Sequence, residues 1–321
     1  MKRYIGKRAL TGVLMVLISV CVNFTLVRLA PGDPIKIMAG TENPNYDQME
    51  ALTKKYGLDK SIPEQFVMFI GGIAQGDLGY SYFNDEAVID LISGRIVPTL
   101  MLSLTALLFS VTIGTFLGIQ AARRNNSLFD RICCGISYVF DSTPGFWLGM
   151  MFMLLFASNL KWFPTSGMVN LRAGYTGFNR VLDIAYHLVL PVSTMVCTQI
   201  PYYFRIARSS VLQVTSEDFI TTFKATGMSK KKVFNKYVFK NAILPTITVV
   251  GVSISFLLSG TVLLENVFSW PGMGRLLFRS IGQRDYPVLT GIYFMTSCTV
   301  AIMMIIIDVV YGLVDPRIKN D

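Results

Sequence analysis

The residue types that usually perform catalysis or hold a metal are sparse in this sequence of 321 residues. The chain has one histidine, His187, and contains no Ser/His/Asp, Cys/His or zinc-peptidase pattern. The string GMSK at Gly227–Lys230 lacks the glycine spacing with which a Walker loop cradles phosphates. The sequence therefore predicts no catalytic residue, no protein-built metal site and no nucleotide bound by this chain.

A basic, amphipathic stretch from Glu217 to Pro245 has the character of a binding surface. Gly227 marks a turn between two predicted helices, because glycine adopts the left-handed backbone that ends a helix. The second helix carries its apolar residues among lysines, at Val233, Tyr237, Val238 and Leu244. This pattern is typical of a helix on anionic lipid, at about 1 kcal/mol per basic residue, and equally of a docking element for a soluble protein.

Asp141 is the only acid deep inside a long apolar run, Ile132–Asn159. At about 1.5 Å per residue it lies roughly 14 Å into a hydrocarbon core about 30 Å thick. An ionised carboxylate facing lipid there costs at least about 2.5 kcal/mol, and no Lys or Arg lies at matching depth in another predicted span. We therefore expect Asp141 to face protein or water. It is either a protonated or hydrogen-bonded acid between helices, or it lines a polar path through the membrane, for which Ser142 and Gln199 are further candidates.

The elements that must position these residues are membrane helices. Of all residues 52% are hydrophobic and only 15% charged, far from the roughly one-quarter charged content of soluble domains. Spanning hydrocarbon takes about 20 apolar residues. Six runs qualify: Ala9–Val27, Val97–Gln120, Ile132–Asn159, His187–Phe204, Ala242–Leu264 and Pro287–Ile307. The predicted fold class is an all-α integral membrane protein with six transmembrane helices, in which Gly114 and Gly118 would let another helix approach closely.

The net charge of +9 comes from short basic clusters beside these runs, which argues for the positive-inside rule and against a nucleic-acid partner. Four basic residues precede the first run, and no small-residue cleavage site follows it, so we expect a retained anchor with a cytoplasmic N-terminus. Six spans return the C-terminus, with Arg317 and Lys319, to the same side. Segment 205–241 is strongly basic and predicted cytoplasmic, whereas segment 31–96 is acidic and predicted extracytoplasmic.

Segment 31–96 is too long for a bare connection and is predicted to form a cap. Two pairs, Asn45 with Gln48 and Ser61 with Glu64, resemble capping boxes that begin helices. The second helix would present an apolar face made of Ile62, Phe66, Phe69, Ile70 and Ile73, which requires burial. The predicted division is therefore a cytoplasmic N-terminus with the first span at 1–30, a cap at 31–96, and a transmembrane core at 97–321 that includes the segment 205–241.

Six short strings accompany the basic segment from one end of the chain to the other. They are LAPGDP at 29–34, YGLD at 56–59, GDLGYSY at 76–82, FSWPG at 268–272, RDYP at 284–287 and DPR at 315–317. Together with Gly227 and the pair Leu244-Pro245, this ordered set resembles the oligopeptide, dipeptide and nickel permease family of binding-protein-dependent ABC importers. The chain departs from many relatives in one respect, since Ala225 alone remains of the alanines that precede the motif glycine.

The resemblance implies a cytoplasmic coupling helix between the fourth and fifth spans that docks on an ATPase. The coupling residues that it implies are Glu217, Asp218, Thr222, Lys224, Ala225, Gly227, Met228, Ser229, Lys230, Asn241 and Pro245. It implies a heterodimer with a second, similar permease, two ATPase subunits that bind ATP and Mg²⁺, and a substrate-binding protein outside a bacterial plasma or inner membrane. Segment 31–96 and the turn Trp270-Pro271-Gly272 are expected either to dock that protein and gate the path or merely to cover the ends of the spans.

Peptides are the expected cargo, as the family's commonest one. Nickel or other metal chelates and glutathione remain open, because the binding protein mainly sets selectivity. A channel or a secondary transporter is the rival from another class of protein. It would need no ATPase and would leave the basic coupling segment unexplained, so co-purification with an ATPase separates the two.

Overall fold

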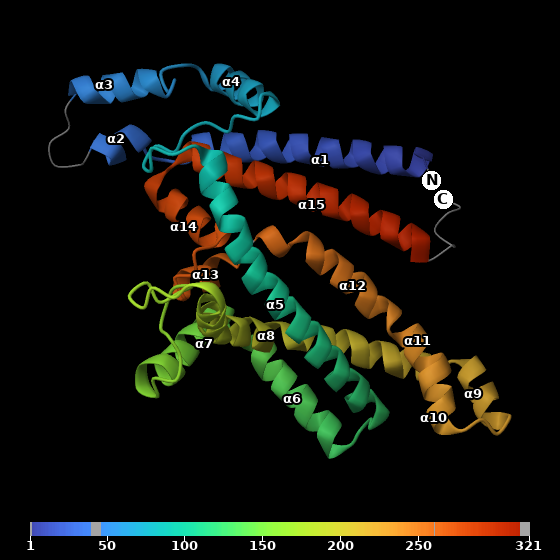
Figure 1. Ribbon diagram of the computed structural model, residues 1–321. Coiled ribbons are helices and arrows are strands. Elements are labelled where there is room, and N and C mark those ends of the chain that lie inside the picture. Colours follow the sequence, from blue (N-terminus) through green and yellow to red (C-terminus); the bar gives the residue numbers. More distant parts are fainter. Residues whose placement is uncertain (1, 40–45, 260, 315–321) are drawn as a thin grey trace. The chain divides into compact units, whose positions relative to one another are not determined.

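The computed structural model describes residues 2–39, 46–259 and 261–314. It is built of helices (Figure 1), and contacts within the chain divide it into two compact units. The first unit comprises the described residues of Met1–Thr99, Leu258–Val262 and Pro271–Asp321, and the second those of Leu100–Leu257 and Leu263–Trp270. The predicted cap segment 31–96 falls within the first unit and the predicted coupling segment 205–241 within the second.

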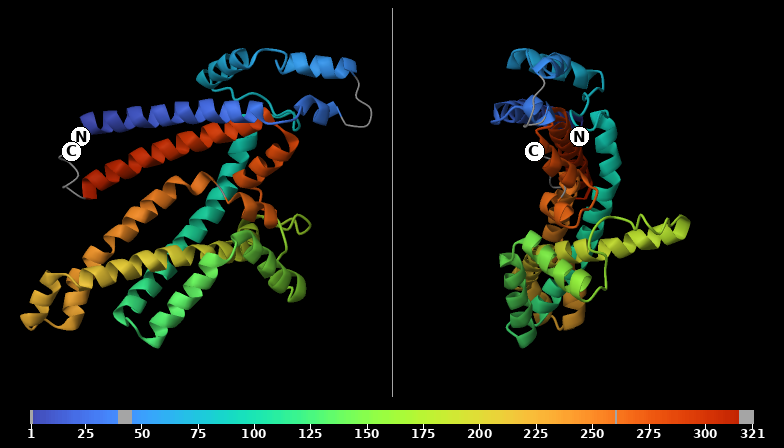
Figure 2. Two further views of the ribbon diagram at one scale, coloured as in Figure 1. Left: turned by 180° about the vertical axis from the view of Figure 1, so that it is seen from behind. Right: turned by 90° about the vertical axis from the view of Figure 1, so that its left-hand side faces the viewer.

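The helices of the first unit are α1 (Lys2–Leu29), α2 (Pro34–Ala39), α3 (Tyr46–Lys55), α4 (Ile62–Ala74), the start of α5 (Val88–Arg123), α14 (Met273–Gln283) and α15 (Tyr286–Val314). Two of them, α1 and α15, lie side by side and antiparallel (Figure 2, left). The hydroxyls of Ser19 and Ser297 are 2.6 Å apart. A Cβ on Gly12 would lie 3.3 Å from Ile305, so the absence of a side chain at Gly12 permits this close packing.

The predicted second helix of the cap is α4, and its capping box is confirmed. The Glu64 carboxylate accepts hydrogen bonds from both the backbone N–H and the hydroxyl of Ser61. The helix packs against α1, because Phe66 and Phe69 lie 5.2 and 5.6 Å from the Phe24 ring. In the other predicted pair, Asn45 with Gln48, Asn45 lies outside the described ranges. Outside them too are Arg317, Lys319 and the string at 315–317.

Four of the six strings meet in the first unit. Asp285 is fully buried and accepts hydrogen bonds from the Ser81 hydroxyl at 2.5 Å and the Tyr82 N–H at 3.1 Å. The Tyr82 ring lies 4.4 Å from that of Tyr56. Gly32, whose φ is +121°, has no room for a side chain beside the Arg284 guanidinium. Burial raises the pKa of Tyr82 to about 12, although the nearby positive charge of Arg28 lowers it, so the phenol stays neutral.

We expect Ser81→Ala to destabilise the first unit by about 1.5 to 3 kcal/mol, because the buried carboxylate of Asp285 would lose its hydroxyl donor. Burial raises the pKa of Asp285, so the folded protein keeps the proton of this carboxyl group at a pH where the unfolded chain has lost it. Stability from this group is therefore full at low pH and lost as the pH rises through the folded pKa. The Ser81 hydroxyl stabilises the ionised carboxylate, so the loss of stability in Ser81→Ala should be larger at high pH than at low pH.

Thermal unfolding of the purified protein at mildly acidic and mildly alkaline pH measures this effect. Ser93→Ala is a suitable control, because the exposed Ser93 hydroxyl only donates to the Asp90 carbonyl. A Ser81→Ala penalty that is independent of pH, or no larger than that of Ser93→Ala, would contradict the prediction.

The second unit contains the rest of α5, then α6 (Leu128–Ser142), α7 (Gly145–Phe152), the π-helix η1 (Met153–Asn159), α8 (Gly177–Thr215), α9 (Asp218–Ala225), α10 (Lys230–Val233), the π-helix η2 (Phe234–Val238), α11 (Phe239–Ala242), α12 (Leu244–Ser255) and most of α13 (Val262–Val267). A short 3-10 helix, η3, covers Leu257–Ser259. Within the described residues, five helices are long and apolar enough to cross a membrane, or six if one bent pair counts as a span.

The bent pair corrects the third predicted span. Ile132–Asn159 is not one straight helix, because α6 and the helix that follows it are bent by 99° at a break after Ser142. The break coincides with Pro144, whose ring disfavours the helical region for the preceding residue. Thr143 is accordingly extended, with φ −93° and ψ 123°.

Two further spans differ from their predicted bounds. The fourth is not short, because α8 continues through Pro191 and Pro201 and ends only at Thr215. The fifth, predicted at Ala242–Leu264, is instead the apolar helical stretch Lys230–Ser255. Helix α12 ends at Ser255, four residues before Ser259-Gly260-Thr261, a sequence of residue types that favour turns.

The crossing of α5 and α8 uses the predicted small-residue pair. A Cβ on Gly114 would lie 2.9 Å from Tyr203 Cβ, and one on Gly118 would lie 2.5 Å from the Phe204 carbonyl oxygen. Both distances are too short for a real side chain, so the two glycines are what lets these backbones touch. Gly114 and Gly118 therefore serve a helix contact inside the chain.

Gly118→Ala is expected to destabilise the second unit by about 1 to 3 kcal/mol, because the added methyl group must push α8 away. Gly135→Ala is the matched control, since nothing lies within 4 Å of a Cβ built there. Thermal unfolding of the two variants in the same detergent makes the comparison. Equal unfolding temperatures would show that the crossing is looser than the structure indicates.

Candidate functional site

The predicted coupling segment forms a helical hairpin at the end of α8 (Figure 1). Helix α9 ends at Ala225, and Gly227 follows with φ +79°, a backbone conformation that favours glycine. The Gly227 N–H donates to the Lys224 carbonyl at 3.1 Å and the Met228 N–H to that of Phe223 at 3.3 Å. The glycine therefore turns the chain tightly into α10, as the sequence predicted.

An apolar cluster beneath the hairpin fixes it to the spans. Its buried members are Ala122 of α5, Val211 of α8, Ile220 of α9, Val233, Val238 and Ala242. The rings of Phe223 and Tyr237 stack with centroids 4.0 Å apart, and the Arg123 guanidinium lies 4.6 Å from the Phe234 ring centroid. Leu244, predicted to share this apolar face, is instead half exposed at the start of α12. A movement of the hairpin must therefore move the ends of α5 and α8 with it.

The π-turn η2 explains how Val233 and Val238 share one buried face. Residues five apart lie about 140° apart around a regular α-helix, so they would face different sides. The wider π-turn takes about one residue more per turn and brings Val238 back toward the face of Val233. Both side chains are buried as a result.

Most of the residues implied to couple lie on the outer side of the hairpin. Exposed at or near the turn are Glu217, Asp218, Thr222, Lys224, Ala225, Gly227, Ser229 and Lys230, with Met228 half-buried beside them. Asn241 and Pro245 lie elsewhere, at the junction of α11 and α12. Asn241 donates to the Tyr237 carbonyl at 2.7 Å, and Pro245 occupies the first turn of α12, where its missing N–H is not needed.

Asp141 has a partner that the sequence did not predict. The Arg205 guanidinium donates two hydrogen bonds to the Asp141 carboxylate, of 2.7 and 3.2 Å. The expectation that no cation lies at its depth was wrong, because it assumed that the fourth span ended at Phe204, whereas α8 continues as a helix through Arg205. Both side chains remain a little over two-fifths exposed.

A second and more buried ion pair joins the same two helices. The Asp130 carboxylate accepts hydrogen bonds from Arg208 at 2.7 and 2.9 Å and from the Asn126 N–H at 3.0 Å. The Asp130 side chain is only 4% exposed. Asp130 and Asp141 are eleven residues apart, a spacing that returns to within about 20° of the same helix face. This spacing indicates from the sequence alone that the two carboxylates share one face of α6.

The other two path candidates lie on the same pair of elements. Ser142 is the last residue of α6, directly before the break. Gln199 is half-buried on α8, six residues before Arg205 and therefore about 9 Å from it along the axis. The start of α7 packs against the preceding residue, because a Cβ on Gly145 would lie 3.5 Å from Thr198.

The turn Trp270-Pro271-Gly272, a candidate gate, differs from the expected docking surface at its first residue. Trp270 cannot offer its ring to a docking partner, because it is fully buried among Leu102, Leu190, Phe268 and neighbouring apolar residues. Pro271 is half-buried, and the buried Gly272 caps α14. Among the residues in the described ranges, no group of three or more His, Cys, Asp or Glu side chains is placed to hold a metal.

Comparisons with known proteins give a consistent result. The "Dipeptide transport system permease protein DppB" of Escherichia coli is 33% identical over 92% of this chain and 93% of its own length. The "Di/tripeptide transport system permease protein DppB" of Pseudomonas aeruginosa is 35% identical over the same shares of both chains. The "Oligopeptide transport system permease protein AppB" of Bacillus subtilis is 32% identical over 99% of this chain and 100% of its own length.

A solved structure confirms the fold. A chain of the MetNI methionine ABC transporter, in an inward-facing conformation, aligns with a TM-score of 0.55 at 14% identity, covering 71% of this chain and 97% of that one. Residues 1–105 match the family described as the N-terminal part of the binding-protein-dependent transport system membrane component, and residues 114–320 match its inner membrane component. The chain therefore belongs to the family of binding-protein-dependent transport system inner membrane components, and it is a multi-pass inner-membrane protein built for transport.

Proposed function

We propose that this chain is the permease subunit of an ATP-driven importer and that an ATPase subunit docks on the hairpin around Gly227. The observation that carries the proposal is the construction of that hairpin. Its outer side is exposed and polar, while its inner side is fastened to α5 and α8 by the cluster of Ile220, Val233 and Val238. ATP and Mg²⁺ bind in two partner subunits, and their closure moves the hairpin and hence the spans.

Peptides are the proposed cargo. Three relatives that align over more than nine-tenths of this chain carry dipeptide, di/tripeptide or oligopeptide transport in their names. A substrate-binding protein delivers the peptide from outside the membrane, where the cap 31–96 and the Pro271-Gly272 turn would receive it. Both chain termini are cytoplasmic in this proposal, and a second, similar permease completes the path.

The break between α6 and α7 supports a role for Asp141 in the path. Hydrocarbon cannot hydrogen-bond the backbone groups that are released where a helix stops, so non-helical backbone at membrane depth must face protein or water. Asp141 and Ser142 lie directly before this break, and the Asp141–Arg205 pair is only partly covered by its own chain. A half-exposed ion pair beside such a break is suited to contact a zwitterionic cargo.

Uptake into proteoliposomes tests the proposal. The complex, purified from its own membrane, is reconstituted with its binding protein and given a labelled dipeptide, glutathione or a nickel chelate. We expect ATP-dependent dipeptide uptake, abolished when the ATPase subunits are omitted. Uptake driven by an ion gradient without an ATPase would assign a secondary transporter, uptake that only follows the cargo gradient would assign a channel, and preference for either other cargo would overturn the peptide assignment.

A further inference from the structure

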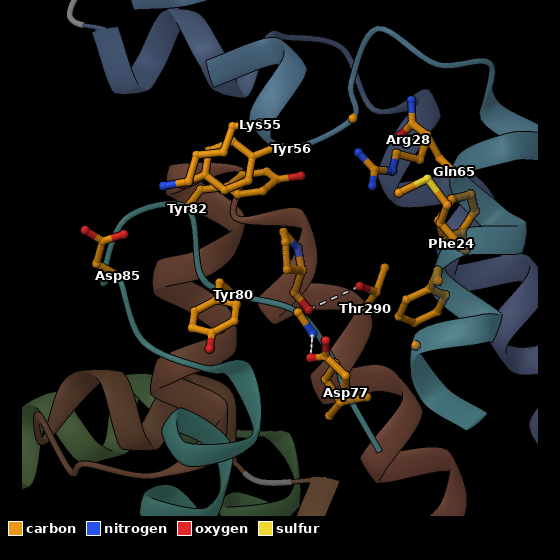
Figure 3. Close-up of a pocket in the computed structure, with 17 residues that line it drawn as sticks. Phe24, Arg28, Lys55, Tyr56, Gln65, Asp77, Tyr80, Tyr82, Asp85 and Thr290 are labelled. Atoms are coloured by element: carbon orange, nitrogen blue, oxygen red, sulfur yellow. Dashed lines mark hydrogen bonds between the residues drawn. The ribbon is translucent and has the colours of Figure 1, made fainter. Parts of the chain in front are cut away.

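A cavity of about 660 Å³ lies in the first unit where α1 ends and α15 begins (Figure 3). The last turn of α1, helix α4, the loop around Asp77 to Asp85 and the start of α15 form its walls. Arg28 is next to the end of the apolar span Arg8–Leu29, and Thr290 is near the start of the span Tyr286–Ile307. The cavity therefore lies at the depth where hydrocarbon gives way to lipid headgroups.

Arg28 is held in this wall by aromatic rings. Its guanidinium carbon lies 5.3 Å from the centroid of Phe24 and 4.9 Å from that of Tyr286. The rings stabilise the cation through their faces. Its Nε and Nη1 atoms are buried and have no hydrogen-bond partner among the residues that the structure describes. A guanidinium presents such N–H groups in its plane, in the fork that matches a phosphate or carboxylate.

Gln65 supplies the complementary group. Its Nε2 donates to the Lys60 carbonyl at 2.9 Å, which leaves Oε1 as a buried acceptor without a partner in the described part of the chain. Figure 3 shows Gln65 and Arg28 on one side of the cavity, with Lys55 and Asp85 on the other. Within the described part of the chain, one wall therefore holds two unpartnered N–H donors of Arg28, whose side chain also hydrogen-bonds with Tyr82, beside the unpartnered acceptor of Gln65.

We propose that this cavity binds the headgroup of a phospholipid that carries a primary ammonium, as in phosphatidylethanolamine. The phosphate accepts hydrogen bonds from Arg28, and the ammonium donates to Gln65 Oε1. Apolar side chains beside the site favour a lipid over a soluble carboxylate, because Met68 of the cavity wall and Leu29 of α1 are 52% and 65% exposed, where acyl chains would cover them. The proposal is independent of the transported cargo.

Native mass spectrometry of the purified complex, titrated with phosphatidylethanolamine and phosphatidylcholine of the same acyl chains, tests the site. The two lipids share phosphate and charge, but the choline nitrogen has no N–H. We expect the wild type to bind the ethanolamine lipid about fivefold more tightly. Arg28→Met should weaken both lipids by about tenfold, whereas Arg279→Met, which removes an exposed arginine of α14, should change neither.

Gln65→Leu keeps Arg28 and removes only the acceptor, so it should make the two lipids equal while both still bind. Gln65→Leu therefore tests the headgroup site even if Arg28→Met does not fold. Equal binding of the two lipids by the wild type, or equal effects of Arg28→Met and Arg279→Met, would overturn the proposal. Displacement of the lipid by soluble glycerophosphoethanolamine or by a dipeptide would also overturn it, by assigning a soluble headgroup or a peptide carboxylate instead.

Discussion

Gly227→Val is expected to lower the ATPase activity stimulated by loaded binding protein at least about tenfold, without loss of the folded permease. Gly227 has φ +79°, where an L-residue costs about 1–2 kcal/mol and a β-branched one is a rare outlier. The buried cluster under the hairpin holds α9 and α10, so the strain falls on the exposed turn, where we propose that the ATPase docks. Proteoliposomes that contain the complete complex provide the measurement.

Two companion variants separate backbone strain from crowding of the docked surface. Gly227→Asn should retain most of the stimulation, because asparagine visits the left-handed region and a Cβ at Gly227 meets nothing within 4 Å. Gly227→Glu should lose it, since bulk and charge are added to a tight turn. Stimulation by all three variants within twofold of the wild type would remove the turn from the coupling mechanism.

Asp130→Asn should cost about 1.5–3 kcal/mol, because the mostly buried Arg208 guanidinium loses the charge of its partner and keeps only neutral acceptors, such as Asn125 Oδ1. Asp141→Asn should cost about 0–1 kcal/mol where the more exposed Arg205 pair faces water, as proposed. The two substitutions are chemically identical and lie on one helix, so each serves as the control for the other. Thermal unfolding and the yield of monodisperse complex measure the difference.

The reversed pair Asp130→Arg with Arg208→Asp tests whether the charge interaction is the cause. This double variant should recover part of the stability lost in Asp130→Asn. Transport of cationic and neutral peptides by Asp141→Asn then addresses the path, since a residue that contacts cargo should alter the preference between them. Equal losses of stability in Asp130→Asn and Asp141→Asn would show that burial does not distinguish the pairs.

The elements that the sequence predicted well are those determined by local chemistry. Runs of apolar residues located the first, second and sixth spans, because hydrocarbon thickness sets their length. The Ser61 and Glu64 pair located the start of α4, and Gly227 located the hairpin turn, because each depends on backbone groups only a few residues away. The identities of these residues are sufficient to predict the local structure.

The features that were missed depend on direction and on distant contacts. Hydropathy is the same for a straight span and a bent one. The break at Thr143-Pro144 is therefore indicated by the proline and not by the number of apolar residues. The Arg205 partner of Asp141 lies 64 residues away, and no periodicity in the sequence predicts which helices pack together. Trp270, in the turn expected either to dock a partner or to cover the ends of the spans, is buried because distant parts of the second unit enclose it.

The length of α8 gives it the proportions of an unequal lever. Its crossing with α5 lies at Phe204, which is eleven residues from Thr215 and twenty-seven from Gly177. At 1.5 Å per residue the two arms measure about 16 and 40 Å. For α8 turning as one body about that crossing, a sideways shift of 3 Å at the hairpin end becomes roughly 7 Å at the other end. The mechanical advantage therefore favours a large displacement far from the hairpin over a strong force there.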